Sequence, residues 1–343
     1  MTPLLEDLHA PRETVANGNG QARIVIGLVN NMPDAALRAT ERQFQELLFT
    51  AGSSLSLRLR LFALPGIPRG SAAQLHLLQH YEDISELWAS DLDGLIVTGA
   101  EPHTPDIKEE PFWRSFEKLV DWAEDHTTST IWSCLAAHAA VLHLDGIERR
   151  PYHEKLSGVF ACIKAADHPI LAGVPPHWCI PHSRYNGLPE PALVSCGYGV
   201  LSRLSEAGVD MFSRRGRSLF LFFQGHPEYG PDTLLREYRR DIGRFLAGER
   251  DSYPPMPRGL LSMDAVAALS ALRRRALLQH DVNVLQDFPA AVMNTKPVHA
   301  WQEIAVDLYE NWLSCLAGQK TQGAAATMPC APAVSYWGSG GAP

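Results

Sequence analysis

The sequence lacks several features that would place a protein in a class at once. Its six cysteines are scattered and form no C-x-x-C pair, which argues against a disulfide framework. No run approaches the ~18 consecutive apolar residues that a membrane-spanning helix needs. Residues 1–20 are acidic and polar, without the basic-then-apolar order of a secretory signal. These absences predict a cytoplasmic protein that does not enter a membrane.

Charge and metal-ligand patterns exclude further classes. The formal net charge is -8, whereas a general nucleic-acid binder carries a basic face. No pair of histidines has the spacing typical of metal ligands, so we expect neither a structural nor a catalytic metal. Hydrophobic residues make up 45% of the chain, which is enough to build a full core. We therefore expect a globular protein that is not a general nucleic-acid binder.

Short apolar runs alternate with amphipathic segments in the first half of the chain. The pattern predicts strands at residues 22–29, 55–61, 92–98 and 130–133. It predicts helices at residues 34–50, 112–125 and 135–144. Alternating strands and helices indicate βαβ units. We therefore expect an α/β fold with a doubly wound, mainly parallel sheet and helices on both faces.

The second half has a different organisation. Residues 209–224 predict a hairpin around Arg214, Arg215, Gly216 and Arg217. We expect its arginines to be solvated, with contact to the phosphates of a ligand as the alternative. Residues 252–259 contain three prolines and predict a loop. Helices are predicted at residues 231–246, 263–281 and 297–316. We expect residues 1–20 to be disordered, residues 21–318 to form a single domain, and the Ala/Gly/Pro-rich residues 319–343 to be a disordered tail.

Cys134 lies where a predicted strand turns directly into a predicted helix. A sharp turn of this kind lifts a side chain clear of the carboxyl edge of the sheet. The sulfur would then lie at a helix N-terminus, where the dipole and free N–H groups stabilise a thiolate and an oxyanion. An arbitrary cysteine in such a chain is more often a buried core residue. The position of Cys134 nevertheless makes it the candidate nucleophile.

His226 and Glu228 follow the apolar strand at residues 220–224. Residues two apart in an extended segment point the same way, so the two side chains can converge. A carboxylate behind an imidazole fixes its tautomer and raises its basicity, as a Cys–His site requires. Pro227 between them stiffens the backbone. The sequence therefore predicts a catalytic set of Cys134, His226 and Glu228.

Several segments together resemble the homoserine O-succinyltransferase family. They follow in order along most of the chain, at residues 31–33 (NMP), 40–44 (TERQF), 93–100 (DGLIVTGA), 133–134 (SC), 154–159 (EKLSGV), 181–185 (PHSRY), 225–229 (GHPEY) and 311–313 (NWL). The resemblance implies a flavodoxin-like fold, similar to class I glutamine amidotransferases, with extra C-terminal helices. It also implies that residues 21–318 form an acyltransferase domain, and it suggests a homodimer.

The resemblance implies roles for residues at matching positions. Cys134 would carry the acyl group as a thioester, His226 would accept the proton, and Glu228 would orient His226. Residues at three further positions would contact substrate: Lys155, Ser183 and Arg240. The substrates would be L-homoserine and an acyl-CoA, with no permanently bound cofactor. The expected reaction is ping-pong transfer of a succinyl group from succinyl-CoA to homoserine in methionine biosynthesis.

The chain also departs from the family pattern. Leu135 stands where many relatives carry Trp, His138 where they commonly carry Gln, and Glu101 where Pro is usual. His103 aligns with the position that separates acyl preference, where Gly accompanies succinyl and Glu accompanies acetyl. Transfer from acetyl-CoA is therefore an alternative, as is serine in place of homoserine. A glutamine amidotransferase is a weaker alternative, because such enzymes carry residues other than Trp132, Ala136 and His138 around the cysteine.

Overall fold

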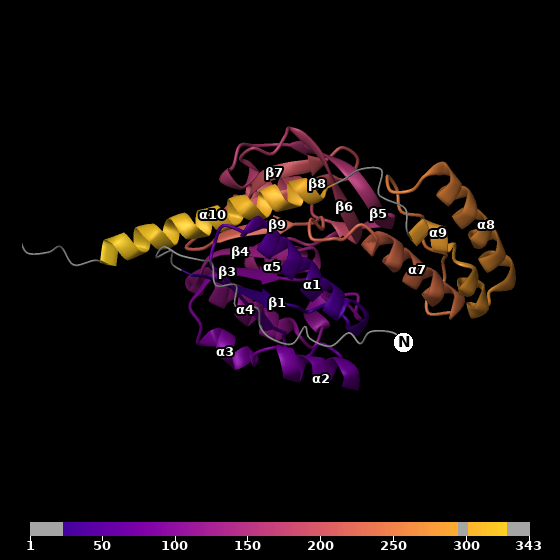
Figure 1. Ribbon diagram of the computed structural model, residues 1–343, viewed down its shortest axis with the longest axis horizontal. Coiled ribbons are helices and arrows are strands. Elements are labelled where there is room, and N and C mark those ends of the chain that lie inside the picture. The colour runs from indigo at the N-terminus through magenta and orange to yellow at the C-terminus, as the bar shows by residue number, and fades with distance from the viewer. Residues whose placement is uncertain (1–22, 294–300, 328–343) are drawn as a thin grey trace, which may run out of the picture.

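The computed structural model of the protein describes residues 23–293 and 301–327 (Figure 1). One nine-stranded sheet has the order β2-β1-β3-β4-β9-β8-β7-β5-β6. Five neighbouring strands are mutually parallel: β2 (Leu57–Phe62), β1 (Ile24–Val29), β3 (Leu92–Val97), β4 (Thr127–Ser133) and β9 (Leu219–Phe223). Their order is that of flavodoxin-like sheets, in which ligands bind beyond the carboxyl ends of the strands. The expected parallel α/β core is confirmed.

Four antiparallel strands extend this core: β8 (Gly208–Arg215), β7 (Gly199–Leu204), β5 (Arg150–Lys164) and β6 (His177–Gly187). The hairpin predicted at residues 209–224 corresponds to β8 and β9. The long pair of β5 and β6 was not predicted. β5 contains Pro151 and Gly158, and its register shifts between Pro151 and Leu156. Such features are typical of loops and edges, and they conceal the strand in the sequence.

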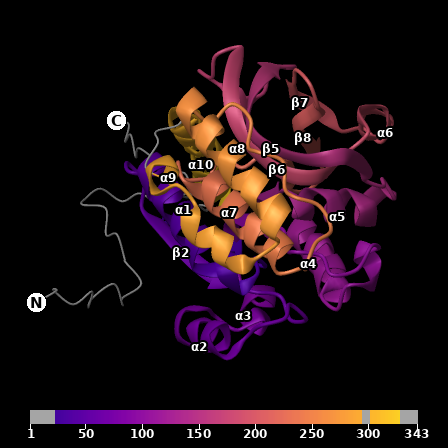
Figure 2. The ribbon, with the colours of Figure 1, turned by 90° about the vertical axis from the view of Figure 1, so that its right-hand side faces the viewer.

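Helices cover both faces of the parallel strands (Figures 1 and 2). On one face α1 (Asp34–Ala51) and α10 (Gln302–Thr327) pack around Phe44 and Trp312. On the other face α4 (Trp113–His126) and α5 (Leu135–Asp145) pack around Phe116 and Trp132. The doubly wound arrangement is therefore confirmed. The smaller elements are α2 (Ser71–His80), α3 (Ile84–Trp88), η1 (Ile107–Glu109), η2 (Pro169–Leu171) and α6 (Glu190–Ser195).

A separate helical unit lies at one end of the sheet (Figure 1). It consists of α7 (Thr233–Leu246), α8 (Met263–Gln279), η3 (Val282–Asp287) and α9 (Ala290–Met293), which share an apolar cluster that includes Trp301. The indole Nε1 of Trp301 donates to Tyr229 O at 2.9 Å. This bond ties the helical unit to the loop after β9. None of the helices in the described ranges has the length and apolar character needed to cross a membrane.

Helix α10 runs past the expected domain boundary at residue 318 and ends at Thr327. Alanine is the strongest helix former, so an Ala-rich segment continues a helix that is already anchored. The anchor is Lys320, whose Nζ lies 2.7 Å from Asp93 Oδ2 and 2.6 Å from Arg23 O. The expectations of disorder for residues 1–20 and 328–343 concern segments outside the described residues.

Trp312 fixes α10 on the sheet. A Cβ added to Gly94 of β3 would lie 2.7 Å from the indole, so the absence of a side chain there admits the ring. The indole Nε1 donates to Ser129 Oγ at 3.0 Å.

We predict that Trp312→Ala lowers the free energy of unfolding in urea by about 3–5 kcal/mol, because it empties a large buried site. Ser314→Ala, at an exposed position of the same helix, should change it by less than about 0.5 kcal/mol. Equal effects of the two substitutions would contradict this role.

Candidate active site

The chain changes direction at Cys134, between the end of β4 and the start of α5. Cys134 has φ 53° and ψ −112°, a backbone conformation that residues with side chains rarely adopt. Its N–H donates to Phe223 O of β9 at 2.7 Å. The partly exposed thiol therefore lies at the carboxyl edge of the sheet and at the N-terminus of α5. The predicted strand-to-helix turn is present.

His226 lies beside Cys134 in the loop after β9. Its N–H donates to Pro181 O at 2.8 Å, and its ring stacks on Tyr229 with the centroids 4.1 Å apart. Nδ1 of His226 is 2.8 Å from Glu228 Oε1, which leaves Nε2 for the thiol. Burial acts to lower the pKa of His226, but charge and hydrogen bonding from Cys134 and Glu228 outweigh it. The pKa is raised well above its ordinary value.

Gln224 connects α5, the helix that follows Cys134, to the loop that carries His226. Its Oε1 is 2.8 Å from His138 Nε2 and accepts a hydrogen bond from Arg184 Nη1 at 2.9 Å. Its Nε2 donates to Val209 O at 2.6 Å. Burial, followed by the nearby Arg184 charge, lowers the pKa of His138 to about 3. His138 is therefore neutral, and its Nε2–H donates to Gln224.

A cavity of about 430 Å³ opens at Cys134. It contains every candidate catalytic and substrate-contacting residue predicted from the sequence: Cys134, Lys155, Ser183, His226, Glu228 and Arg240. These residues come from β5, β6, α7 and the ends of β4 and β9. His103, the candidate for acyl specificity, is exposed and does not line the cavity, although Glu101 and Pro102 do.

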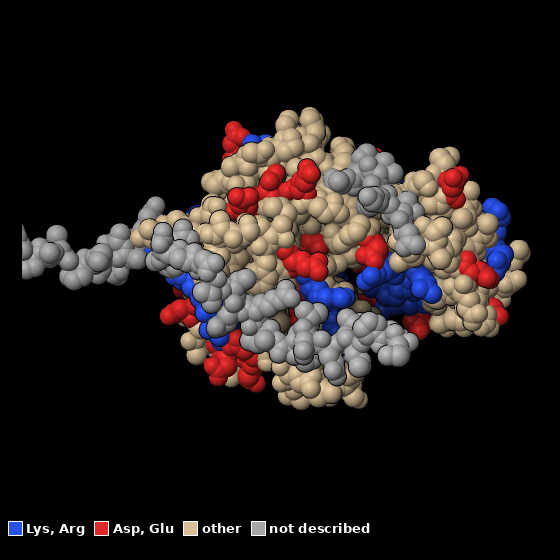
Figure 3. All heavy atoms as spheres, in the orientation of Figure 1, with Lys and Arg blue, Asp and Glu red and all other residues tan. Residues whose placement is uncertain are grey.

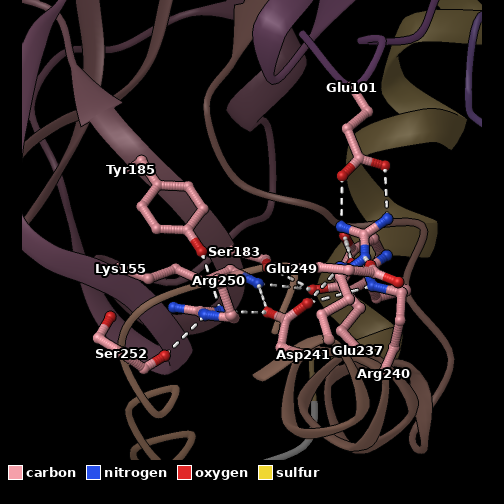
Figure 4. Close-up of polar contacts among 12 residues, drawn as sticks. Glu101, Lys155, Ser183, Tyr185, Glu237, Arg240, Asp241, Glu249, Arg250 and Ser252 are labelled. Atoms are coloured by element: carbon pink, nitrogen blue, oxygen red, sulfur yellow. Dashed lines mark hydrogen bonds and ion pairs between the residues drawn. The ribbon is translucent and has the colours of Figure 1, made fainter. Parts of the chain in front are cut away.

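One wall of the cavity is a network of charged side chains (Figure 4). Lys155 Nζ lies 2.8 Å from Asp241 Oδ2 and 3.7 Å from Glu237 Oε2. Ser183 donates to Glu237, and Arg240 Nη2 is 3.0 Å from Asp241 Oδ1. Burial acts to raise the pKa of Glu237 and Asp241, but the charges of Lys155 and Arg240, together with hydrogen bonds, outweigh it, so the pKa of each carboxyl is lowered. The wall therefore presents two ionised carboxylates beside two cations.

Glu237 and Asp241 were not predicted from the sequence, and neither was the ion pair of Arg244 with Glu101 at the same cavity. Arg244 Nη2 lies 3.1 Å from Glu101 Oε2. Together with Arg240, the charged residues of α7 recur at spacings of three and four. This spacing places them on one face of the helix. A charged face of this kind is the feature of the sequence from which these residues could have been predicted.

A second group of ionisable residues lies in the interior. The ligand atoms of Cys162, His182 and Asp210 all lie within 4.8 Å of one another. Asp210 Oδ2 accepts from Ser202 Oγ at 2.7 Å and from Cys162 Sγ at 3.5 Å, while Oδ1 is 3.1 Å from His182 Nε2. Burial, followed by the Asp210 charge, raises the pKa of Cys162, so its thiol stays protonated. Asp210 is the shared partner of the other residues, and we therefore interpret this group as a buried polar cluster of the core.

The sequence matches the model of the family described as homoserine O-succinyltransferase over residues 5–323. It is 48% identical over 297 residues to the homoserine O-succinyltransferase of Methylorubrum extorquens, covering 87% of this chain and 88% of that one. It is 45% identical over 315 residues to the same enzyme of Bradyrhizobium japonicum, covering 90% of this chain and 96% of that one. A solved glutamine amidotransferase from Methylobacillus flagellatus is similar at a TM-score of 0.49 and 14% identity, covering 86% of this chain and 96% of that one. This protein belongs to the homoserine O-succinyltransferase family.

Proposed function

We propose that this protein transfers the succinyl group of succinyl-CoA to the hydroxyl of L-homoserine, as a cytoplasmic enzyme of methionine biosynthesis without a resident cofactor. The observation that carries the proposal is the arrangement of Cys134, His226 and Glu228 in one cavity, with Glu228 held 2.8 Å from His226 Nδ1. The names of the curated relatives support succinyl-CoA as donor and homoserine as acceptor.

The first half of the reaction forms an acyl-enzyme. His226 takes the thiol proton of Cys134, and the thiolate attacks the thioester carbonyl carbon of succinyl-CoA. The carbon–sulfur bond to CoA breaks, and the proton held by His226 passes to the departing sulfur, so CoA leaves as its thiol and His226 is neutral again. Glu228 stabilises the imidazolium that forms and holds Nδ1 in its protonated state.

The attack places negative charge on the oxygen of the thioester carbonyl. This oxyanion needs backbone N–H donors that are not already hydrogen-bonded. The N–H of Cys134 is bound to Phe223 O, so it does not serve. The N–H of Leu135 is the first of α5 and has no intrahelical acceptor. A Cβ on Gly99 would lie 3.1 Å from that nitrogen, so the glycine keeps access to it open. We assign Leu135 N–H, with Ala100 N–H opposite, to the oxyanion.

The second half regenerates the enzyme. His226 accepts the hydroxyl proton of homoserine while the oxygen attacks the carbonyl of the Cys134 thioester. The carbon–sulfur bond breaks, and the Cys134 sulfur recovers its proton from His226. Homoserine also carries a carboxylate and an ammonium group, and the charged wall offers both complements. Arg240 suits the carboxylate and Glu237 the ammonium, with Ser183 and Lys155 holding Glu237 in place.

We predict that Cys134→Ala lowers kcat by about 10³-fold or more, because no other group can carry the acyl unit. Wild-type protein mixed with succinyl-CoA, without homoserine, should gain the mass of one succinyl group, and peptide mapping should place it on Cys134. Acetyl-CoA should label it less efficiently. Cys196→Ala is the control, since Cys196 is exposed and lies outside the cavity. Full turnover by Cys134→Ala would refute the mechanism.

We predict that Glu228→Gln moves the pH dependence of acyl transfer to homoserine. His226 must be neutral to accept the proton, so the rate of this half-reaction rises as pH passes upward through its pKa. Glu228 raises that pKa, and its removal should move the inflection down by about 1 unit or more. The plateau should also fall by about 10²-fold, because the ring loses its orienting partner. Single-turnover rates of pre-acylated enzyme test this, and an inflection that moves upward would contradict it.

We predict that Arg240→Ala raises KM for homoserine about tenfold or more, through loss of a charged hydrogen bond. KM for succinyl-CoA should stay within about twofold of the wild-type value, because the carboxylate that Arg240 binds belongs to homoserine. Arg236→Ala is the matched control, since Arg236 lies on the exposed side of the same helix and pairs with Asp232. Steady-state kinetics in both substrates measure these changes. A rise confined to KM for succinyl-CoA would reassign Arg240 to the donor.

A further inference from the structure

A second cavity, of about 610 Å³, lies next to the cavity that contains Cys134. The two share four lining residues, all labelled in Figure 4: Lys155, Tyr185, Arg250 and Ser252. The remaining walls come from the start of β5, the loop at residues 252–256, Tyr238 of α7 and the second half of α8. A ligand bound at Cys134 can therefore continue into the second cavity through the neck that the shared residues form.

The second cavity is rich in guanidinium groups. Arg250, Arg273 and Arg274 line it, and Glu154 is the single carboxylate among its described lining residues. This excess of positive charge stands out in a chain with a formal net charge of -8. Lys and Arg also gather over α7 at the surface in Figure 3. Such a site favours an anionic ligand.

Arg273 and Arg274 differ from the next residue of α8. Arg275 forms an ion pair with Asp287. Among residues 23–293 and 301–327, no carboxylate lies within ion-pair distance of Arg273 or Arg274. The Arg273 guanidinium instead lies over the ring of Tyr253, 5.8 Å from the centroid. Two unpaired guanidinium groups therefore remain available for phosphate oxygens.

The neck and one wall add exposed apolar surface. Tyr185 is 49% exposed at the neck, and Leu277 is 51% exposed on α8. Aromatic and apolar surface of this kind can cover the aliphatic part of a ligand that passes from one cavity to the other. The other arginine-rich segment, the β8–β9 turn, lines neither cavity, and its Arg214 pairs with Asp145 at 3.0 Å.

We infer that the second cavity binds the phosphorylated nucleotide of the acyl-CoA donor, with Arg273 and Arg274 on its phosphates and the thioester arm passing Tyr185 to Cys134. The inference rests on the proposed function, because it concerns the donor of that reaction. It assigns recognition of the donor to α8, whereas the charged wall of α7 faces the acceptor. Homoserine is small and fills only the first cavity.

The test compares two donors in the double variant Arg273→Ala/Arg274→Ala. KM for succinyl-CoA should rise about tenfold or more, because two charged contacts are lost. KM for S-succinylpantetheine, which has the same thioester but no nucleotide, should not rise. Arg275→Ala is the matched control, because it removes the neighbouring charge outside the cavity. An equal rise with both donors, or no rise with succinyl-CoA, would overturn the inference.

Direct binding separates this inference from the proposed function. Titration calorimetry with CoA and with adenosine 3′,5′-bisphosphate should show binding to the wild type and to Arg275→Ala. The double variant should bind each about tenfold or more weakly. Equal affinities would overturn the inference even if the enzyme succinylates homoserine. If neither donor is turned over, the proposed function fails, and the binding data still decide whether this cavity takes a nucleotide.

Discussion

The parallel pairing of β4 with β9 is the constraint on which the site depends. Ser133 is paired with Phe223, and the next residue, Cys134, donates its N–H to Phe223 O at 2.7 Å. Because parallel strands end at the same edge of the sheet, the residues that follow them must be neighbours. Cys134 and His226 therefore meet although they are far apart in the sequence. The same bond holds Cys134 in its positive-φ conformation and removes its N–H from oxyanion binding.

This edge was predictable because its signals are local. A short apolar run before Cys134, an Ala-rich helix after it, and the two-residue spacing of His226 and Glu228 all stand in the sequence. The antiparallel extension was not predictable in this way. Gly158 of β5 has φ 145°, and a Cβ there would lie 2.2 Å from Arg258 O, so the strand depends on a close approach of a distant loop. The residue pattern within β5 alone does not predict that contact.

The charged wall escaped prediction for a related reason. Glu237 and Asp241 look like ordinary exposed acids of a surface helix, and only Lys155 of β5 makes them part of a site. Their burial would disfavour ionisation without that partner. Lys155 lies in residues 154–159, one of the segments that resemble the family. For this reason it was predicted from the sequence although its partners were not. Polar groups that depend on tertiary neighbours cannot be assigned from spacing alone.

The ion pair of Arg244 with Glu101 connects the sheet edge to the helical unit at the cavity. Both side chains are about one-third exposed, so the pair contributes about 1 kcal/mol or less to stability. The pair acts mainly by orienting a side chain, because it turns the Arg244 guanidinium toward the loop after β3. Glu101 stands where the family usually carries proline, so this restraint comes from a departure of the chain itself. Arg244 is therefore held by Glu101, while Arg240, to which the proposed reaction assigns the substrate carboxylate, lies one helical turn earlier on the same face and is paired with Asp241.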